Sequence, residues 1–139
     1  MIKYTNNLEN LDENMLSGFF VGWLNPPSSS AHMRILKGSY CVWLAIDTEI
    51  NKVVGFINAI SDGVLSAYIP LLEVLPEYKK SGIGKTLFSH MLDSLKGFYM
   101  IDVVHDKELQ GYYAQFGMFK HTASCLRNHK STLNDSYGG

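Results

Sequence analysis

Cysteine is scarce in this chain, since Cys41 and Cys125 are the only 2 among 139 residues. Two cysteines provide no disulfide framework, so the fold has to rely on a hydrophobic core. Cys41 opens an apolar run, and we interpret it as a core residue rather than a nucleophile. The 5 histidines show no metal-ligand spacing with each other or with the cysteines, so we expect no metal site.

The sequence also lacks an excess of charge and any long hydrophobic run. Its 12 Lys and Arg residues against 13 Asp and Glu residues give a net charge of −1. That balance argues against a broadly basic nucleic-acid surface but leaves a local basic patch open. No apolar run reaches the length of a membrane span, and the opening stretch MIKYTNNLEN has no signal-peptide core. We therefore expect a cytoplasmic, reduced protein with neither a membrane nor a nucleic acid as its partner.

Hydrophobic residues make up 46% of the chain, which excludes a mostly disordered protein. The length favours one compact domain with a sizeable core. We expect this domain to span residues 1–128 and residues 129–139 to form a polar, flexible tail.

The order of hydrophobic patterns predicts alternating helices and strands. Apolar residues spaced by three or four positions predict helices, and apolar runs bounded by turn residues predict strands. We expect helices at 8–19, 31–38, 83–95 and 107–117. We expect strands at 2–5, 41–47, 52–60, 65–75, 98–106 and 118–126.

This order, β-α-α-β-β-β-α-β-α-β, indicates an α+β fold in three layers. The strands between residues 41 and 75 are joined by short turns, which predicts an antiparallel meander. The strand–helix–strand crossover at 65–105 makes one pair of strands parallel. The result is a mixed, mostly antiparallel sheet with helices on both faces.

The stretch SGIGKT at residues 81–86 is similar to a nucleotide-binding P-loop. Gly84, Lys85 and Thr86 match the end of G-x-x-x-x-G-K-S/T, but Lys79 stands where the first glycine belongs. That glycine lets the loop wrap a phosphate with positive φ, which lysine does poorly. Only about 50 residues follow the loop, too few for the rest of a nucleotide-hydrolysing sheet. ATP or GTP chemistry is therefore the less favoured alternative.

A pyrophosphate loop explains more of these residues. Lys79-x-x-Gly82-x-Gly84 follows a predicted strand and leads directly into a predicted helix. Two glycines let backbone amides approach an anion, and the positive end of the helix dipole adds to them. Lys79, Lys80 and Lys85 contribute three cationic side chains. The stretch therefore predicts a pyrophosphate site that needs no Mg²⁺.

Two motifs resemble the GNAT N-acyltransferases. The stretch from Val74 to Leu87 is similar to the family's acetyl-CoA signature R/Q-x-x-G-x-G/A, with Lys79 where Arg or Gln is commoner. Tyr112 to Met118 is similar to the family's F/Y-Y-x-x-x-G-F, with Met118 as its last residue. The motifs occur in the family's order with a predicted strand between them. The resemblance covers nearly the whole chain and implies a GNAT fold with acetyl-CoA as co-substrate and no metal.

In this family the pantetheine arm of the cofactor lies between two diverging strands. The resemblance implies that the backbone N–H of Val74 polarises the thioester carbonyl, and that His105 can hydrogen-bond the pantetheine arm. Pro70 has no N–H, so a central strand tolerates it only at a bulge or an unpaired edge. The residues expected to bind acetyl-CoA are Val74, Lys79, Lys80, Ser81, Gly82, Ile83, Gly84, Lys85, Thr86 and His105.

The resemblance also implies the catalytic groups. Tyr113 matches the family's general-acid tyrosine, which would protonate the departing coenzyme A thiolate, and Tyr112 is expected to pack inward. Attack requires a neutral amine, so a base is expected. Glu73 is the only charged residue of the predicted strand 65–75 and is our candidate base. Asp62 and water are the alternatives.

The acceptor is expected to be a small primary amine or a peptide amine. Phe19 and Trp23 are candidate lining residues, although packing of a helical hairpin is the favoured explanation for aromatic residues in this segment. Asp62, a further candidate substrate-binding residue, and Glu73 would favour a cationic acceptor. We predict direct acetyl transfer in a ternary complex; a non-catalytic acyl-CoA sensor on the same fold is the alternative. Many relatives form dimers, so a homodimer is also considered.

Overall fold

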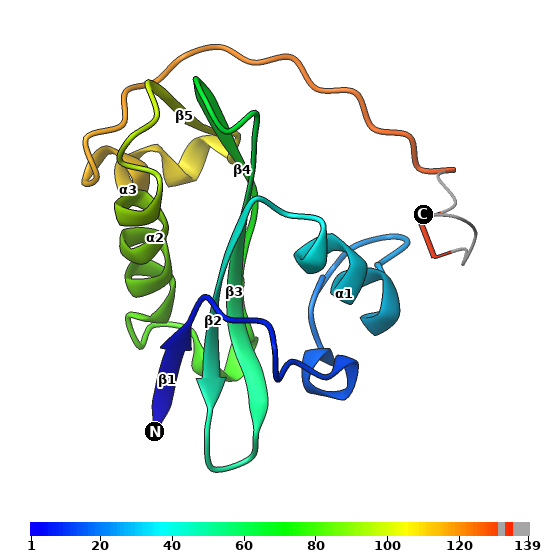
Figure 1. Ribbon diagram of the computed structural model, residues 1–139. Helices are drawn as coiled ribbons and strands as arrows, with labels where there is room; N and C mark the ends of the chain where they lie inside the picture. Colours follow the sequence, from blue (N-terminus) through cyan, green and yellow to red (C-terminus); the bar gives the residue numbers. More distant parts are fainter. Residues whose placement is uncertain (131–132, 135–139) are drawn as a thin grey trace.

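A five-stranded sheet forms the centre of the structure, a computed structural model that describes residues 1–130, 133 and 134. The strands lie in the order β1-β2-β3-β4-β5, of which the first four are antiparallel and β5 is parallel to β4 (Figure 1). This arrangement confirms the predicted mixed, mostly antiparallel sheet. The strands are β1 (Ile2–Thr5), β2 (Cys41–Asp47), β3 (Lys52–Ser61), β4 (Ser66–Val74) and β5 (Met100–Val103).

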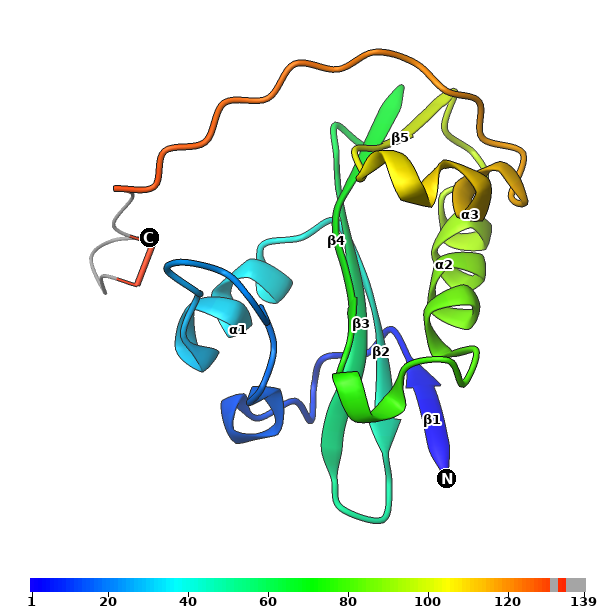
Figure 2. The ribbon, with the colours of Figure 1, turned by 180° about the vertical axis from the view of Figure 1, so that it is seen from behind.

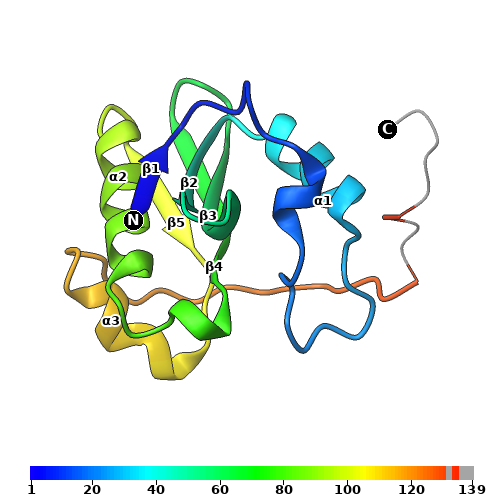
Figure 3. The same cartoon turned by 90° about the horizontal axis from the view of Figure 1, so that it is seen from below.

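Helices cover both faces of this sheet, which confirms the three-layer α+β architecture (Figures 2 and 3). On one face lie α2 (Ile83–Ser94) and α3 (Gln110–Ala114), which follow the 3-10 turns η2 (Pro76–Tyr78) and η3 (Lys107–Leu109). On the other face lie the 3-10 turn η1 (Glu13–Leu16) and α1 (Ser29–Lys37).

Helix α2 packs directly on the centre of the sheet because β3 carries a glycine there. An added Cβ at Gly55 would lie 3.1 Å from Ile83 Cγ2 and 3.1 Å from Leu87 Cδ1. A side chain at this position would therefore push the helix away from the sheet. On the opposite layer, Ser28 caps α1 by accepting a hydrogen bond from Ala31 N at 3.1 Å.

The first predicted helix, at 8–19, is wrong. The structure forms only one 3-10 turn there, at Glu13–Leu16. Polar side chains before it hydrogen-bond the local backbone instead, as when Asn7 Oδ1 accepts from Glu9 N at 2.9 Å. After it, the positive φ angles of Gly18 (92°) and Phe20 (62°) turn the chain. The apolar residues of this segment still reach the core, but along an irregular path.

The end of the chain also differs from prediction. The strand expected at 98–106 is confined to Met100–Val103, and the helix expected at 107–117 is split into η3 and α3. Residues 118–126, where the last strand was expected, form no strand. They run extended and exposed from α3 toward α1 (Figure 1). Most of the predicted tail at 129–139 lies outside the described residues, and the expected boundary at residue 128 stays a prediction.

None of the helices in the described part of the chain has the length and hydropathy needed to cross a bilayer.

One polar side chain is buried in the aromatic core between α1 and the sheet. The imidazole of His32 is 1% exposed and lies edge-on to Phe56, Phe20 and Phe19, with ring centroids 4.4, 4.9 and 5.5 Å away. Neither ring nitrogen has a hydrogen-bond partner among the described residues. Burial lowers the pKa of His32 from 6.5 to about 4, so the ring is neutral in the folded protein at pH 7.

We expect His32 to make the protein less stable in mild acid. Between pH 6.5 and about 4 the unfolded chain binds a proton that the folded chain does not, so stability falls as pH falls through this window. At pH 5 this amounts to about 2 kcal/mol of unfolding free energy. Urea unfolding at pH 5 and pH 7.5 measures the difference. His32→Leu should abolish most of it, whereas His129→Leu, the exposed control, should not; an unchanged difference in His32→Leu would contradict the assignment.

Candidate active site

The two strands on either side of the β4–α2–β5 crossover separate toward their carboxyl ends. Their parallel pairing joins Ser66–Ile69 to Met100–Val103 and then stops. Strand β4 continues to Val74, whereas β5 ends at Val103. The second half of β4 therefore has an open edge on the side away from β3, which agrees with the divergence that the resemblance implies.

A β-bulge marks the point of divergence. Asn58 pairs with Leu71 and Ile60 pairs with Tyr68, so Ile69 and Pro70 together oppose the single residue Ala59. The bulge bends β4, and its proline cannot donate to either neighbouring strand. Pro70 therefore lies at a β-bulge, which is one of the two environments expected for it from the sequence.

The open edge of β4 presents backbone amides. In an antiparallel ladder, alternate residues point their N–H groups toward the same neighbour. Leu75 N donates to Val54 O at 2.8 Å, so Leu75 and Glu73 face β3. The N–H groups of Val74 and Leu72 therefore point away from β3, toward the gap that opens beside β4 where β5 has ended. The sequence motif identified Val74; Leu72 was missed, although its position two residues earlier in the strand gives it the same orientation.

The glycine loop leaves a run of backbone amides without acceptors at the start of α2. Lys80 (φ 66°) and Gly82 (φ 84°) both adopt left-handed backbone conformations. The first amide of the helix to find an intramolecular acceptor is that of Thr86, which donates to Gly82 O at 3.0 Å. Among the described residues, the N–H groups from Lys80 to Lys85 have no acceptor. Free amides on a left-handed turn at a helix N-terminus suit a diphosphate.

The loop is held in place at its base. Tyr78 donates a hydrogen bond to Asp47 Oδ2 at 2.6 Å, and Ser81 Oγ donates to Tyr78 O. The Tyr78 hydrogen bond lowers the pKa of Asp47 and raises the pKa of Tyr78, so both groups keep their hydrogen-bonding forms at neutral pH. Lys79, Lys80 and Lys85 remain exposed to solvent around the loop and are available to an anion.

Tyr113 lies on the same face of the sheet as α2. Its ring is 6% exposed and packs against Phe88 at 5.2 Å, Tyr112 at 5.1 Å and His105 at 4.6 Å between centroids. Burial, followed by the charge of Tyr112, raises the pKa of Tyr113, so its hydroxyl stays protonated at neutral pH. The expectation that Tyr112 is the inward residue is wrong: Tyr113 is buried, and Tyr112 is half-buried beside the glycine loop.

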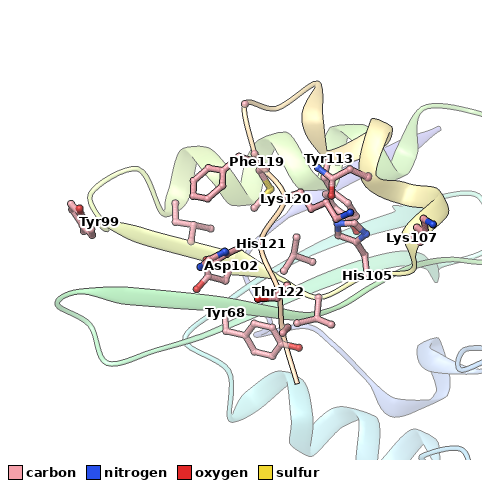
Figure 4. A pocket seen from close by; sticks show the side chains of 17 residues that line it. Tyr68, Tyr99, Asp102, His105, Lys107, Tyr113, Phe119, Lys120, His121 and Thr122 are labelled. Carbon is pink, nitrogen blue, oxygen red and sulfur yellow. The ribbon is translucent and has the colours of Figure 1, made fainter. Parts of the chain in front are cut away.

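His105 follows β5 and stacks on Tyr113 at an interplanar angle of 27°. Figure 4 shows the two side chains together at one end of a groove of about 1180 Å³ that runs along β5. His105 Nδ1 lies 2.7 Å from Asp106 O, which fixes the ring orientation. His105, which we expect to bind the pantetheine arm, therefore lies next to Tyr113, the predicted general acid.

Glu73 lies on the opposite face of β4 from Val74. Its carboxylate accepts hydrogen bonds from Phe20 N at 2.8 and 2.9 Å and from Val21 N at 3.3 Å. These contacts tie the loop after η1 to β4. No sequence pattern indicates this pairing, because the interacting groups on the loop are backbone amides and Phe20 lies 53 positions from Glu73.

Asp62 is not brought together with Glu73. It lies in the β3–β4 turn, at the other end of β4, where Oδ1 accepts from the amides of Val64, Leu65 and Ser66. These hydrogen bonds lower the pKa of Asp62. The contacts show that the Asp62 carboxylate stabilises the β3–β4 turn. A role in substrate binding stays a prediction.

The two aromatic candidates for the acceptor site are placed differently. Phe19 is buried against Phe56 and His32, as in the packing interpretation. Trp23 is half exposed, packs edge-on against Phe20 at 5.1 Å and lines a second cavity of about 310 Å³. Trp23 is therefore the one of the two whose side chain is accessible to a ligand.

In the described part of the chain, no three His, Cys, Asp or Glu side chains come close enough to hold a metal ion.

Comparisons with known proteins agree with this geometry. Residues 8–118 match the model of the Acetyltransferase (GNAT) family. A crystal structure of a Deinococcus radiodurans R1 protein assigned to the acetyltransferases is 35% identical, with a TM-score of 0.91 over 96% of this chain and 93% of that one. A GNAT family acetyltransferase from Streptococcus pneumoniae TIGR4 is 27% identical, with a TM-score of 0.69 over 94% and 98%.

An uncharacterized N-acetyltransferase of Pyropia yezoensis is 24% identical over 103 residues. That match covers 72% of this chain and 59% of the relative, so the chain spans somewhat more than half the length of that protein. The matched family model, the 35% identical structure and the diverging strands lead to one conclusion: the chain belongs to the GNAT acetyltransferase family.

Proposed function

We propose that this protein is an N-acetyltransferase that moves the acetyl group of acetyl-CoA to a primary amine. The observation that carries the proposal is that, among the described residues, two groups of backbone amides have no hydrogen-bond acceptor, one group at the glycine loop and the other at the open edge of β4. Unpaired amides at Lys80–Lys85 offer a diphosphate site, and the N–H groups of Leu72 and Val74 face the gap where the thioester would lie. Their arrangement suits a long, anionic thioester cofactor better than a nucleotide alone.

The faces of β4 separate donor from acceptor. Val74, Gly84 and Tyr113 lie on the α2 face, from which the cofactor would enter the gap. Glu73 and the loop at Phe20 lie on the α1 face, from which an amine would approach the thioester carbon. The two substrates then meet at the open edge of β4, which fits direct attack in a ternary complex.

The residues supply the steps that this attack needs. An amide N–H of the β4 edge stabilises the developing oxyanion. As the C–S bond breaks, the Tyr113 hydroxyl donates its proton to the coenzyme A sulfur. Glu73 accepts the proton that the amine loses, directly or through water, while its other contacts hold the acceptor loop.

A non-catalytic acyl-CoA sensor is the second candidate, because it would need the same loop and the same β4 edge. Calorimetry with coenzyme A and acetyl-CoA, together with release of free thiol over a panel of primary amines, separates the two. Binding with turnover on at least one amine supports the enzyme, and binding without turnover on any amine supports the sensor. No heat with coenzyme A but a Mg²⁺-dependent response to ATP would overturn both.

Glu73→Gln should lower kcat about tenfold with a much smaller change in KM. The amide keeps an oxygen that can accept from Phe20 N but no longer takes a proton from the amine. Water can carry the proton instead, so we expect a loss smaller than the roughly 100-fold lower limit that is typical of general-base catalysis. Steady-state kinetics on the best amine measures both parameters. A raised KM at unchanged kcat would assign Glu73 to holding the loop alone.

A further inference from the structure

Phe20 has a backbone conformation that a bulky residue seldom adopts. Its φ is 62°, in the left-handed region, where the side chain of an ordinary residue crowds the following carbonyl group. Such a conformation persists only where the surrounding structure holds it. Phe20 belongs to the loop between η1 and α1, the two elements that cover the face of the sheet opposite α2 (Figure 3). Contacts of its backbone and of its ring account for the conformation.

The backbone amide of Phe20 points at a carboxylate. It donates to Glu73 Oε1 at 2.8 Å and to Oε2 at 2.9 Å, and the next amide, Val21 N, donates to Oε2 at 3.3 Å. Two consecutive N–H groups thus converge on one carboxylate, an arrangement that suits an anion. Oε2 accepts from both amides and Oε1 from one, so Oε1 keeps the larger capacity to accept a further proton. The two amides therefore orient the candidate base.

The ring of Phe20 is held by three other rings. It is 3% exposed and lies edge-on to His32 and Trp23, with centroids 4.9 and 5.1 Å away, and tilted to Phe56 at 6.0 Å. His32 belongs to α1, and its ring lies 4.4 Å from that of Phe56 on the central strand β3. His32 therefore packs against both the loop and the sheet, and it fixes the one relative to the other.

Stability of the core does not explain a histidine at position 32. Neither of its ring nitrogens has a partner among the described residues, and an unpaired buried polar group costs free energy that an apolar side chain would not. An aromatic ring does offer edge-to-face contacts of defined geometry, which an aliphatic chain lacks. The rings of Phe20 and Phe19 stand at 68° and 81° to the imidazole. A flat ring at this position therefore specifies where Phe20 lies.

We propose that His32 is a positioning residue for the general base. Through its ring contacts it holds Phe20 in the left-handed conformation, and the amides of Phe20 and Val21 then fix the Glu73 carboxylate for proton transfer. The role rests on the proposed function, in which Glu73 takes the proton that the amine loses. His32 itself is 1% exposed and touches neither substrate. Because it acts through Glu73, its removal should cost no more than the roughly tenfold expected from Glu73→Gln.

Residue-resolved hydrogen exchange tests without any substrate whether His32 holds the loop. The amide of Phe20 should be protected in the parent protein, and His32→Ala, which removes the ring, should speed its exchange by roughly tenfold or more. His32→Phe keeps a ring and should restore most of the protection. His90→Ala is the matched control, since His90 also stacks on a neighbouring ring, that of Trp43 at 4.3 Å, but belongs to α2. Unchanged exchange in a folded His32→Ala protein would overturn the proposal.

Phe20→Gly tests the same contact from the other side and serves if His32→Ala fails to fold. Glycine adopts a φ of 62° without strain, so the backbone conformation stays available and only the ring contacts are lost. We expect exchange of the amide at residue 20 to become roughly tenfold faster here as well. Thermal melts verify that each variant is folded. Protection equal to that of the parent protein would mean that the amides hold Glu73 without the rings, which contradicts the proposal.

A double-mutant cycle tests whether His32 acts through the base. In the parent background, His32→Ala should lower kcat about three- to tenfold with little change in the KM for acetyl-CoA, and His32→Phe should restore most of the loss. In the Glu73→Gln background the same His32→Ala substitution should lower kcat less than about twofold, because the group that His32 positions no longer takes a proton. A general structural defect would instead multiply with the loss from Glu73→Gln.

The outcomes separate this role from the proposed function. Equal losses of kcat in the two backgrounds, or an unchanged kcat in His32→Ala, would overturn the positioning role in an active enzyme. A parent protein that acetylates no amine would refute the proposed function, and exchange at Phe20 alone would then decide whether His32 fixes the carboxylate.

Discussion

Tyr113→Phe should lower kcat ten- to a hundredfold while leaving the affinity for acetyl-CoA nearly unchanged. The substitution removes one hydroxyl from a ring that is otherwise fixed by Phe88 and His105, so the packing of α3 should survive. Without the hydroxyl, the sulfur leaves as a free thiolate. A thiol has a pKa of about 8.5, so departure of the unprotonated thiolate is only moderately unfavourable. Removal of the acid should therefore lower kcat less than it would for a more basic leaving group.

Tyr112→Phe is the matched control for this result. Tyr112 neighbours Tyr113 on α3 and carries the same hydroxyl, but its oxygen lies beside Gly84, 3.6 Å from where a Cβ would stand. We expect kcat to change less than threefold in this variant. Thiol release under saturating acetyl-CoA gives kcat, and calorimetry gives the affinity. Equal turnover in Tyr113→Phe and the parent protein would remove the acid role, and a parallel loss in both variants would point to packing instead.

The pH profile provides a second readout for Tyr113. Burial raises the pKa of Tyr113, so the acid stays protonated well above neutral pH. Loss of activity on the alkaline side should therefore begin only near or above the ordinary tyrosine pKa of about 10. In Tyr113→Phe this alkaline limb should disappear.

Local patterns were enough to predict most of the sheet and the cofactor loop. The bounds of β2 are those expected from CVWLAID, because an apolar run between two turns has few alternatives. The loop was recognisable because glycine is needed where φ is positive, and Gly82 has a φ of 84°. In such cases the residue type itself records the local conformation.

Features that depend on contacts between distant segments were not predictable in the same way. The apolar spacing of residues 8–19 is compatible with a helix, yet the segment folds irregularly, with Asn7 bonded to the local backbone before it and the amides of Phe20 and Val21 bonded to Glu73 on β4 after it. The relative burial of Tyr112 and Tyr113 depends on how α3 sits against Phe88, which no spacing on α3 reveals. The strand predicted at 118–126 does not form, because an apolar pattern does not by itself provide a neighbouring strand to pair with.

Gly82→Val should raise the dissociation constant for coenzyme A at least thirtyfold while the protein remains folded. Gly82 precedes α2 with a φ of 84°, and nothing in the protein lies within 4 Å of an added Cβ. The fold itself therefore has room for the side chain. The difficulty is the left-handed backbone, which costs an ordinary residue about 1–2 kcal/mol and a β-branched residue more.

Because of this strain, the loop of the variant either keeps its positive φ at residue 82 or relaxes to a negative φ. Both conformations should bind coenzyme A more weakly. If the loop keeps its course, the two methyl groups add bulk within the run of residues 80–85, whose amides have no acceptor in the described structure. If φ relaxes to a negative value, the course of the loop changes and its free amides change direction, so a diphosphate loses hydrogen bonds. Calorimetry with coenzyme A measures the loss, and Gly97→Val is the control, because Gly97 has ordinary φ and equally open surroundings. Since the loop contributes binding and no proton transfer, kcat at saturating acetyl-CoA should fall far less than affinity; unchanged affinity in Gly82→Val would mean that the cofactor diphosphate binds elsewhere.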